Sequence, residues 1–142
     1  MEKTLDHTPY RTEDIPNEAA VFYRIHEQYI DKDESDEKRK IKPSAFDPFP
    51  KPDGTEMSVD WSKYSSAQLL KDRARKPEKN GIVSFNVALV RENPTPLKVE
   101  HRPTYPDPDN RSHSIVFDVV PNSNDPEIRI KLRRICQWEI LI

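Results

Sequence analysis

Residues 81–92, "GIVSFNVALVRE", alternate apolar with small or polar side chains more regularly than any other stretch of the chain. An extended strand would place four apolar side chains of this stretch on one face: Val83, Phe85, Val87 and Leu89. Such alternation is typical of a strand that packs one face against a core and turns the other towards solvent. We therefore predict a strand over the whole stretch, within a mostly antiparallel sheet.

Several shorter stretches extend this predicted sheet. Alternation predicts strands at residues 57–61, 97–101 and 114–120. Residues 21–30 are rich in β-branched and aromatic side chains, and they fit both a helical face and a strand. We favour a short helical turn that leads into a strand there.

Residues 65–76, "SSAQLLKDRARK", have the signals of a helix. Ser65 or Ser66 can cap its first turn, and Pro77 ends it. The C-terminal segment begins with an equally clear helix start, because Asn124 or Asp125 can act as the cap before a proline. Its apolar residues also fit a strand, and we choose a helix over residues 127–140.

These elements together predict an α+β fold: a small, mostly antiparallel sheet of three to five strands with two or three helices. The chain has 142 residues, which suits one domain. We expect a flexible N-terminus over residues 1–12 and a single domain over residues 13–142. Residues 31–40, "DKDESDEKRK", have no apolar side chain and predict a solvated charged loop within that domain.

The composition excludes several classes of protein. The formal net charge is −2, so a chain-wide positive field for nucleic acid is absent. Two glycines cannot build a glycine-rich phosphate loop, and we expect no cofactor. The single cysteine, Cys136, permits no internal disulfide and is expected to be a buried thiol. No apolar run of membrane-spanning length or signal-peptide type is present, so we expect a cytoplasmic protein with no membrane partner.

Histidine is the first residue type to consider for chemistry, because neutral imidazole can act as a base or a metal ligand. His101 and His113 flank the loop 104–113, where they could converge with Asp107 or Asp109. No two histidines have the spacing of a metal motif, so we expect no metal site.

Acidic side chains also interrupt two of the predicted strands. Asp60 lies in "SVDW" and Asp118 in "IVFDVV". On a one-sided sheet such acids usually face solvent. If both turned inwards near Arg24, they would form a paired polar site.

The C-terminal segment carries a local cluster of positive charge that includes Arg129 and Arg133. These arginines are candidates for contact with an acidic partner or with phosphates. No aromatic residues are interleaved for base stacking, so binding of nucleic acid is disfavoured. If the protein did bind nucleic acid, we expect this basic segment to make the contact.

Four motifs in order, "YRIH" (residues 23–26), "PSAFDP" (43–48), "MSVDW" (57–61) and "NRSHSIV" (110–116), resemble a group of small bacterial proteins with a domain of unknown function. The group has an arginine-bearing strand, a Ser-Ala-Phe segment, a Leu/Met-Ser-Val stretch and an Asn-x-x-His pattern. The resemblance covers most of residues 15–140 and implies no activity. It implies five candidate functional positions: Arg24, Ser44, Phe46, Ser58 and His113.

Proline-stiffened loops carry aromatic side chains outside the predicted strands. Phe46 and Phe49 lie in "PSAFDPFP", and Tyr105 lies in "TYPDPDN". The two phenylalanines either plug the end of the core or form a rigid rim for a partner. Tyr105 is a further candidate for partner contact.

Two functional hypotheses follow. The first is a non-catalytic interaction or accessory module of a bacterial multi-protein system, favoured because no catalytic signature is visible. The second is a small enzyme or binder that acts on a nucleotide or an RNA end and resembles ADP-ribosyl transferases. In it, Arg24 would contact a phosphate and Ser58 would be a polar contact. Convergence of Arg24, Asp60 and His113 on one cleft would favour the second hypothesis.

Overall fold

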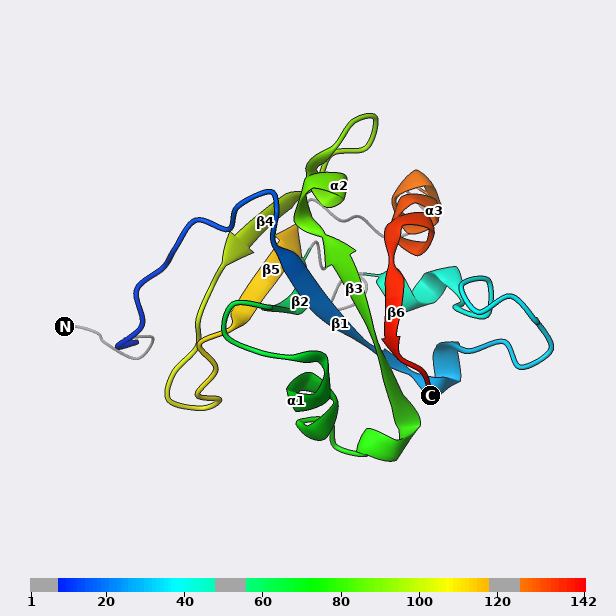
Figure 1. The fold of residues 1–142 in the computed structure, drawn as a ribbon, viewed down its shortest axis with the longest axis horizontal. Helices are drawn as coiled ribbons and strands as arrows, with labels where there is room; N and C mark the ends of the chain where they lie inside the picture. Colours follow the sequence, from blue (N-terminus) through cyan, green and yellow to red (C-terminus); the bar gives the residue numbers. More distant parts are fainter. Residues whose placement is uncertain (1–7, 48–55, 118–125) are drawn as a thin grey trace.

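The structure is a computed structural model, and it describes residues 8–47, 56–117 and 126–142 (Figure 1). Its centre is a six-stranded sheet in the order β4-β5-β2-β1-β3-β6, with antiparallel pairing between all neighbours. The strands are β1 (Ala20–His26), β2 (Glu56–Trp61), β3 (Asn80–Asn86), β4 (Lys98–His101), β5 (His113–Phe117) and β6 (Gln137–Ile140).

The described chain also has three α-helices, namely α1 (Ala67–Asp72), α2 (Val87–Arg91) and α3 (Pro126–Ile135). Short 3-10 turns are η1 (Glu27–Tyr29), η2 (Pro43–Phe46) and η3 (Pro77–Lys79). The α+β class is confirmed. The prediction of three to five strands is wrong, because the C-terminal segment supplies a sixth.

The stretch 81–92 is only half a strand. The strand ends at Asn86, whose side-chain oxygen accepts a hydrogen bond from the backbone N–H of Leu89 and caps α2. Asparagine is among the residues that most favour this capping position. The predicted strand over Val87 and Leu89 is therefore wrong, and Leu89 lies on an exposed helical surface.

The C-terminal segment changes from helix to strand near Cys136. Helix α3 ends at Ile135, and β6 pairs with β3, so the predicted helix is wrong beyond that residue. Gly81 permits the close approach of β6, since a Cβ atom there would lie 2.7 Å from the carbonyl oxygen of Ile140. The predicted caps, Asn124 and Asp125, lie outside the described residues.

Two other local predictions are confirmed at least in part. The backbone N–H of Ala19 donates to the carbonyl of Pro16, so a hydrogen-bonded turn precedes strand β1, although the turn is not helical as predicted. Ser66 caps α1 by accepting from the backbone N–H of Leu69 at 3.1 Å, although that helix is shorter than predicted.

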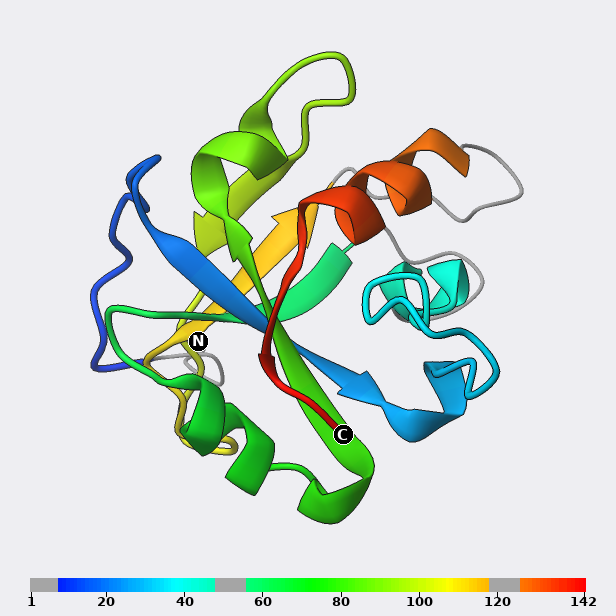
Figure 2. The same ribbon diagram turned by 45° about the vertical axis from the view of Figure 1, so that its right-hand side comes forward.

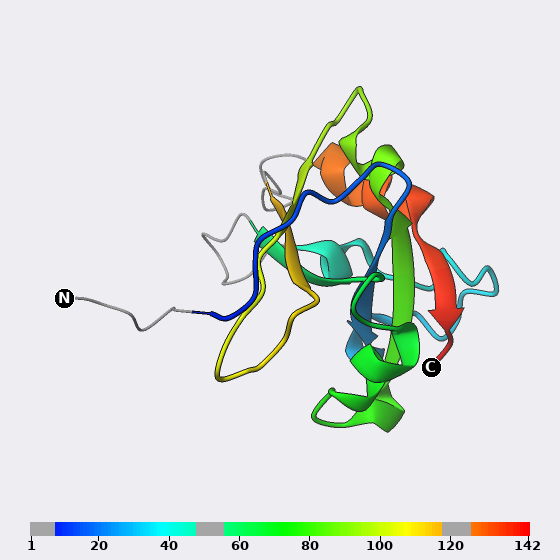
Figure 3. The ribbon, with the colours of Figure 1, turned by 60° about the vertical axis from the view of Figure 1, so that its left-hand side comes forward.

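The helices lie towards opposite ends of the long strands. Figures 1 and 3 place α1 near one end of β3, and α2 and α3 near the other. The main core lies against one face of the sheet and includes Val21, Phe46, Phe85 and Leu132, all fully buried. No helix in the described parts of the chain has the length and apolar character needed to cross a membrane.

The loop 31–40 and the N-terminal segment are both held against the domain. Trp138 donates its indole N–H to the carbonyl of Glu37 at 2.8 Å, and the Lys38 ammonium donates to the carbonyl of Arg134. The Tyr10 hydroxyl donates to Asp109, which places the chain before β1 beside the loop 104–113.

The sheet opens between its two central strands. All seven residues of β1 pair with β3, whereas β1 and β2 pair only at Val21 with Trp61 and at Phe22 with Asp60. Beyond these two pairs the strands diverge, as Figure 2 shows. This divergence positions the candidate site.

Candidate functional site

A cleft of about 400 Å³ opens where β1 and β2 diverge. Its lining includes five residues that were predicted as functional from the sequence: Arg24, Ser44, Ser58, Asp60 and His113. It therefore brings together the three residues whose convergence distinguishes the two hypotheses.

Strand register explains this gathering. Phe22 lies directly across from Asp60, so Arg24 and Ser58 lie on the same face of the sheet but on the two diverging arms. Strand β5 places His113 directly across from Asp60 on its other side. Arg73, the residue that follows α1, adds its side chain as a further wall of the cleft.

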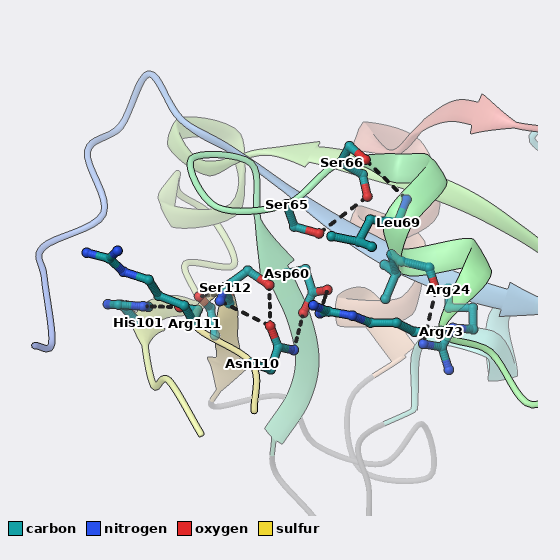
Figure 4. Close-up of polar contacts among 12 residues, drawn as sticks. Arg24, Asp60, Ser65, Ser66, Leu69, Arg73, His101, Asn110, Arg111 and Ser112 are labelled. Carbon is teal, nitrogen blue, oxygen red and sulfur yellow. Dashed lines mark hydrogen bonds and ion pairs between the residues drawn. The ribbon is translucent and has the colours of Figure 1, made fainter. Parts of the chain in front are cut away.

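Asp60 is the buried acid of the cleft, with 3% of its surface exposed. Its Oδ1 accepts a hydrogen bond from the Asn110 side-chain amide at 3.2 Å, and its Oδ2 lies 3.6 Å from a guanidinium nitrogen of Arg73 (Figure 4). Ser112 fixes Asn110, because its backbone N–H and its hydroxyl both donate to the Asn110 amide oxygen. Within the described part of the chain, Oδ2 of Asp60 has no hydrogen-bond donor.

In the part of the chain that the structure describes, Arg24 has a hydrogen-bond donor without an acceptor, whereas Asp60 has an acceptor without a donor. One terminal nitrogen donates to the carbonyl of Leu70 at 3.3 Å, but the buried Nε has no acceptor among the residues described. Burial lowers the pKa of Arg24, the Asp60 carboxylate raises it, and the positive charge of Arg73 lowers it further. Arginine stays protonated in proteins, so the guanidinium remains charged, and its buried Nε is a donor without an acceptor among the described residues.

Ser58 and His113 form a hydrogen-bonded pair at the same cleft. The imidazole Nδ1 lies 2.7 Å from the carbonyl oxygen of Arg102, and Nε2 lies 3.4 Å from the Ser58 hydroxyl. A carbonyl oxygen can only accept, so Nδ1 carries the proton and Nε2 of the neutral ring is an acceptor. The pair is thus arranged with the serine hydroxyl as donor.

The charges that face the cleft are unequally compensated. Asp47 also lines the cleft, but Arg129 binds both of its carboxylate oxygens, with Nε to Oδ1 at 2.7 Å. Arg129 was predicted as a partner contact; its side chain is only 17% exposed, and it anchors η2 to α3 instead. Of the two acids that line the cleft, Asp60 is therefore the one that faces Arg24 and Arg73. Two positive charges against one negative charge make the cleft suitable for an anion.

Phe46 and Phe49 have different outcomes. Phe46 is fully buried, stacks on Tyr23 with ring centroids 6.0 Å apart, and contacts Phe85 edge-on. It therefore fills the core and is not a rim residue. Phe49 lies outside the described residues.

His101 lies away from the cleft. It is buried, its Nδ1 accepts from the backbone N–H of Glu13 at 3.1 Å, and its Nε2 donates to the carbonyl of Arg111 at 2.7 Å. Both ring nitrogens are therefore used by backbone groups, and His101 does not converge with His113. In the described ranges, no three His, Cys, Asp or Glu side chains are placed to hold a metal.

The remaining predicted positions lie on other surfaces or outside the structure. Tyr105 is 42% exposed and contacts Tyr10 edge-on. Arg133 lines a shallow depression beside the loop 31–40. Asp118, which would have formed a paired polar site with Asp60 had both turned inwards, is outside the described residues.

Two side chains that contact Asp60, those of Arg73 and Asn110, were not predicted from the sequence. Arg73 lies in a basic segment that has no feature to distinguish one arginine from another. Asn110 is the first residue of the Asn-x-x-His pattern, and this pattern is the signal that could have identified it. Compared with protein-family models, curated proteins and solved structures, the chain matches none of them.

Proposed function

We propose that the protein binds a nucleotide, or a similar phosphorylated ligand with hydroxyl groups, in the cleft between β1 and β2. One observation carries this proposal. Arg24 and Asp60 line one cleft, and each has a buried side-chain atom without a hydrogen-bond partner among the described residues: the donor Nε of Arg24, and the acceptor Oδ2 of Asp60, which lies 3.6 Å from Arg73. A buried polar group without a partner costs about 1–3 kcal/mol, so a ligand that satisfies both is favoured.

The donor side of the cleft suits a phosphate. Guanidinium groups bind phosphate oxygens through paired, charge-assisted hydrogen bonds. Arg24 and Arg73 repel each other, since the charge of Arg73 lowers the pKa of Arg24. An anion between them would relieve that repulsion.

The acceptor side suits a hydroxyl group. The Asp60 carboxylate already accepts from Asn110 through one oxygen and can accept from a ligand hydroxyl through the other. A nucleotide carries phosphate and ribose hydroxyls on one small molecule. The volume of about 400 Å³ falls in the range of small-molecule sites, roughly 300–1,000 Å³.

This proposal keeps the binding half of the second hypothesis, which was a small enzyme or binder that acts on a nucleotide or an RNA end. A transferase resembling ADP-ribosyl transferases also needs an acidic residue at the reacting centre. Glu100 and Glu139 are exposed and do not line the cleft, so the proposal is limited to ligand binding.

Ligand-dependent thermal stabilisation and calorimetry test the proposal. The panel is inorganic phosphate, ribose 5-phosphate, AMP, ADP and the uncharged nucleoside adenosine. AMP or ADP should bind more tightly than phosphate or adenosine, and a ligand at about 100 times its Kd adds about 2.7 kcal/mol to stability. If no phosphorylated compound stabilises the protein, the proposal is wrong.

Two variants assign the two halves of the ligand. Arg24→Gln should weaken all phosphorylated ligands by about 10–100-fold, the equivalent of about 1.5–3 kcal/mol for a charge-assisted contact. Asp60→Asn should retain phosphate binding but lose the preference for ribose-bearing ligands. Arg39→Gln is the matched control, because Arg39 is exposed and lines a different depression. Equal losses in all three variants would contradict the assignment.

A second candidate function is the interaction module, and one observation favours it. In the described sheet, β6 is an edge strand, and it is followed by the exposed apolar residues Leu141 and Ile142. An edge strand with exposed apolar neighbours can pair with another chain. Affinity capture from the native host tests this proposal, with Leu141→Asp expected to release a stoichiometric partner. A monomer that captures nothing reproducibly would contradict it.

A further inference from the structure

The pair of Ser58 and His113 has the arrangement of a nucleophile and its base. The imidazole of His113 is oriented by a backbone group, because its Nδ1 donates to the carbonyl of Arg102 at 2.7 Å. This bond fixes the tautomer of the neutral ring. The acceptor nitrogen, Nε2, is therefore held towards Ser58.

Ser58 supplies the other half of the pair. Its hydroxyl lies 3.4 Å from Nε2 of His113, and its side chain is exposed at the cleft. Hydrogen bonds between nucleophile and base are often this long before the ligand binds. An exposed hydroxyl beside an oriented, unprotonated nitrogen is the combination that covalent catalysis requires.

We propose that Ser58 is a nucleophile activated by His113, and that the cleft cleaves phosphate monoesters through a phosphoserine intermediate. This inference rests on the proposed binding of a phosphorylated ligand in the same cleft. It adds an activity, because binding alone requires neither a nucleophile nor a base.

The atoms and charges balance over two steps. In the first step, Nε2 of His113 takes the hydroxyl proton while the Ser58 oxygen forms a bond to phosphorus. The bond from phosphorus to the ester oxygen breaks, the ester oxygen keeps the electron pair, and it takes the proton from His113 to leave as an alcohol. In the second, His113 takes a proton from water, the water oxygen attacks phosphorus, and inorganic phosphate leaves as Ser58 recovers its proton. Water is the one co-reactant, and no oxidant or reductant is involved.

The rest of the cleft supports both steps. Arg24 and Arg73 would stabilise the negative charge that the phosphoryl oxygens carry in the transition state. Asp60 lies directly across from His113 in the strand register, and both residues line the cleft.

A fluorophosphonate reagent tests the nucleophile directly, because it forms a phosphorus–oxygen bond with an activated serine and releases fluoride. We expect the intact protein to gain one adduct, located on Ser58 by peptide mapping. Ser58→Ala should abolish that adduct. Ser35→Ala is the control, since Ser35 is exposed in the loop 31–40 and does not line the cleft, and the adduct on Ser58 should persist in that variant. The absence of a Ser58 adduct on the wild-type protein overturns the proposal.

The role of His113 has its own readout. His113→Ala should lower the labelling rate by about 10²–10⁴-fold, the usual contribution of a general base. Added free imidazole should restore part of that rate, which it would not do if the histidine only supported the fold. Labelling at the wild-type rate in a folded His113→Ala protein also overturns the proposal.

The outcomes separate this inference from the proposed function. Nucleotide binding without a Ser58 adduct leaves a binding site and removes the nucleophile. A Ser58 adduct that neither phosphate nor nucleotides protect from the reagent leaves the nucleophile and removes the proposed ligand. Turnover is then measured with p-nitrophenyl phosphate, and Ser58→Ala should retain nucleotide binding while losing release of nitrophenol.

Discussion

Replacement of Lys131 by methionine should be one of the most destabilising single changes in the C-terminal helix. The Lys131 ammonium is 3% exposed, and it donates to three backbone carbonyls: Val90 at 3.0 Å, Glu92 at 2.7 Å and Thr95 at 2.8 Å. These carbonyls close the end of α2 and the loop that follows it. The side chain therefore joins α3 to α2 through all three of its donors.

The expected magnitude follows from these contacts. A hydrogen bond from a charged donor contributes about 1.5–3 kcal/mol, and three of them are opposed by the desolvation of the ammonium, which costs several kcal/mol. Lys131→Met leaves three carbonyls without this donor at about 1–3 kcal/mol each, and relief of the ammonium's desolvation reduces the net loss to about 3–5 kcal/mol. We expect a loss of that size for Lys131→Met, and a fall in Tm of about 10–20 °C.

Urea denaturation of the wild type and two variants measures this loss. Lys32→Met is the control, because Lys32 is exposed in the charged loop, and its free energy of unfolding should change by less than about 0.5 kcal/mol. Lys131→Arg should also destabilise, since a planar guanidinium cannot reproduce three converging contacts of an ammonium. A Lys131→Met protein that loses less than about 1 kcal/mol would refute the reasoning.

Three further changes have defined outcomes. Gly81→Ala should cost about 1–3 kcal/mol and speed hydrogen exchange in β6 before β1, because the added Cβ would lie 2.7 Å from the carbonyl oxygen of Ile140; unchanged exchange would contradict this. Cys136 should react with a thiol reagent only after unfolding, since burial raises its pKa to about 11; rapid reaction of the folded protein would show that the thiol is accessible. The pKa of Glu13 is lowered in the folded protein, chiefly by the hydrogen bond from Lys63. Glu13 therefore stabilises the fold at pH values above its unfolded pKa of 4.5, and this contribution is lost as the pH falls through the lower folded pKa. Glu13→Gln should therefore flatten the acid limb of the stability profile measured by denaturation, and an unaltered profile would exclude this contribution.

Local patterns predicted the parts of the fold that local physics determines. The alternation of Met57, Val59 and Trp61 predicted β2, and all three side chains are buried. The hydroxyl of Ser66 predicted the start of α1, because capping depends on residues three positions apart.

Predictions failed where non-local pairing or a competing local signal decided the outcome. The C-terminal apolar spacing fits a helix as far as Ile135, but the next residues become a strand because β3 offers an edge and Gly81 gives it room. Conversely, the alternation through Val87 continued the strand pattern, while the Asn86 cap began a helix. Alternation describes one chain segment and contains no information about its neighbour.

In the candidate site too, individual residues could be predicted from the sequence, whereas their arrangement in space could not. Arg24, Ser58 and Asp60 could be identified on separate strands, but their meeting depends on the register of β1 with β2 and on the divergence beyond Phe22. Arg73 follows a helix whose position the sequence does not state. His101 was grouped with His113 from their shared loop, whereas its ring nitrogens bind the backbone of Glu13 and Arg111.

The narrow connection between β1 and β2 gives the molecule a mechanical property. Strands β4, β5 and β2 form one half of the sheet and β1, β3 and β6 the other. Among the described residues, two residue pairs of β1 and β2 join the halves, and the backbone N–H of Ser62 donates to the carbonyl of Ala20 beside them. Val21 and Trp61 are buried at this joint, and the cleft lies beyond it, where β1 and β2 diverge. A small rotation about the joint would change the spacing of Arg24 and Ser58 without altering either residue. Substitutions that repack the joint should therefore tune the affinity of the cleft from a distance.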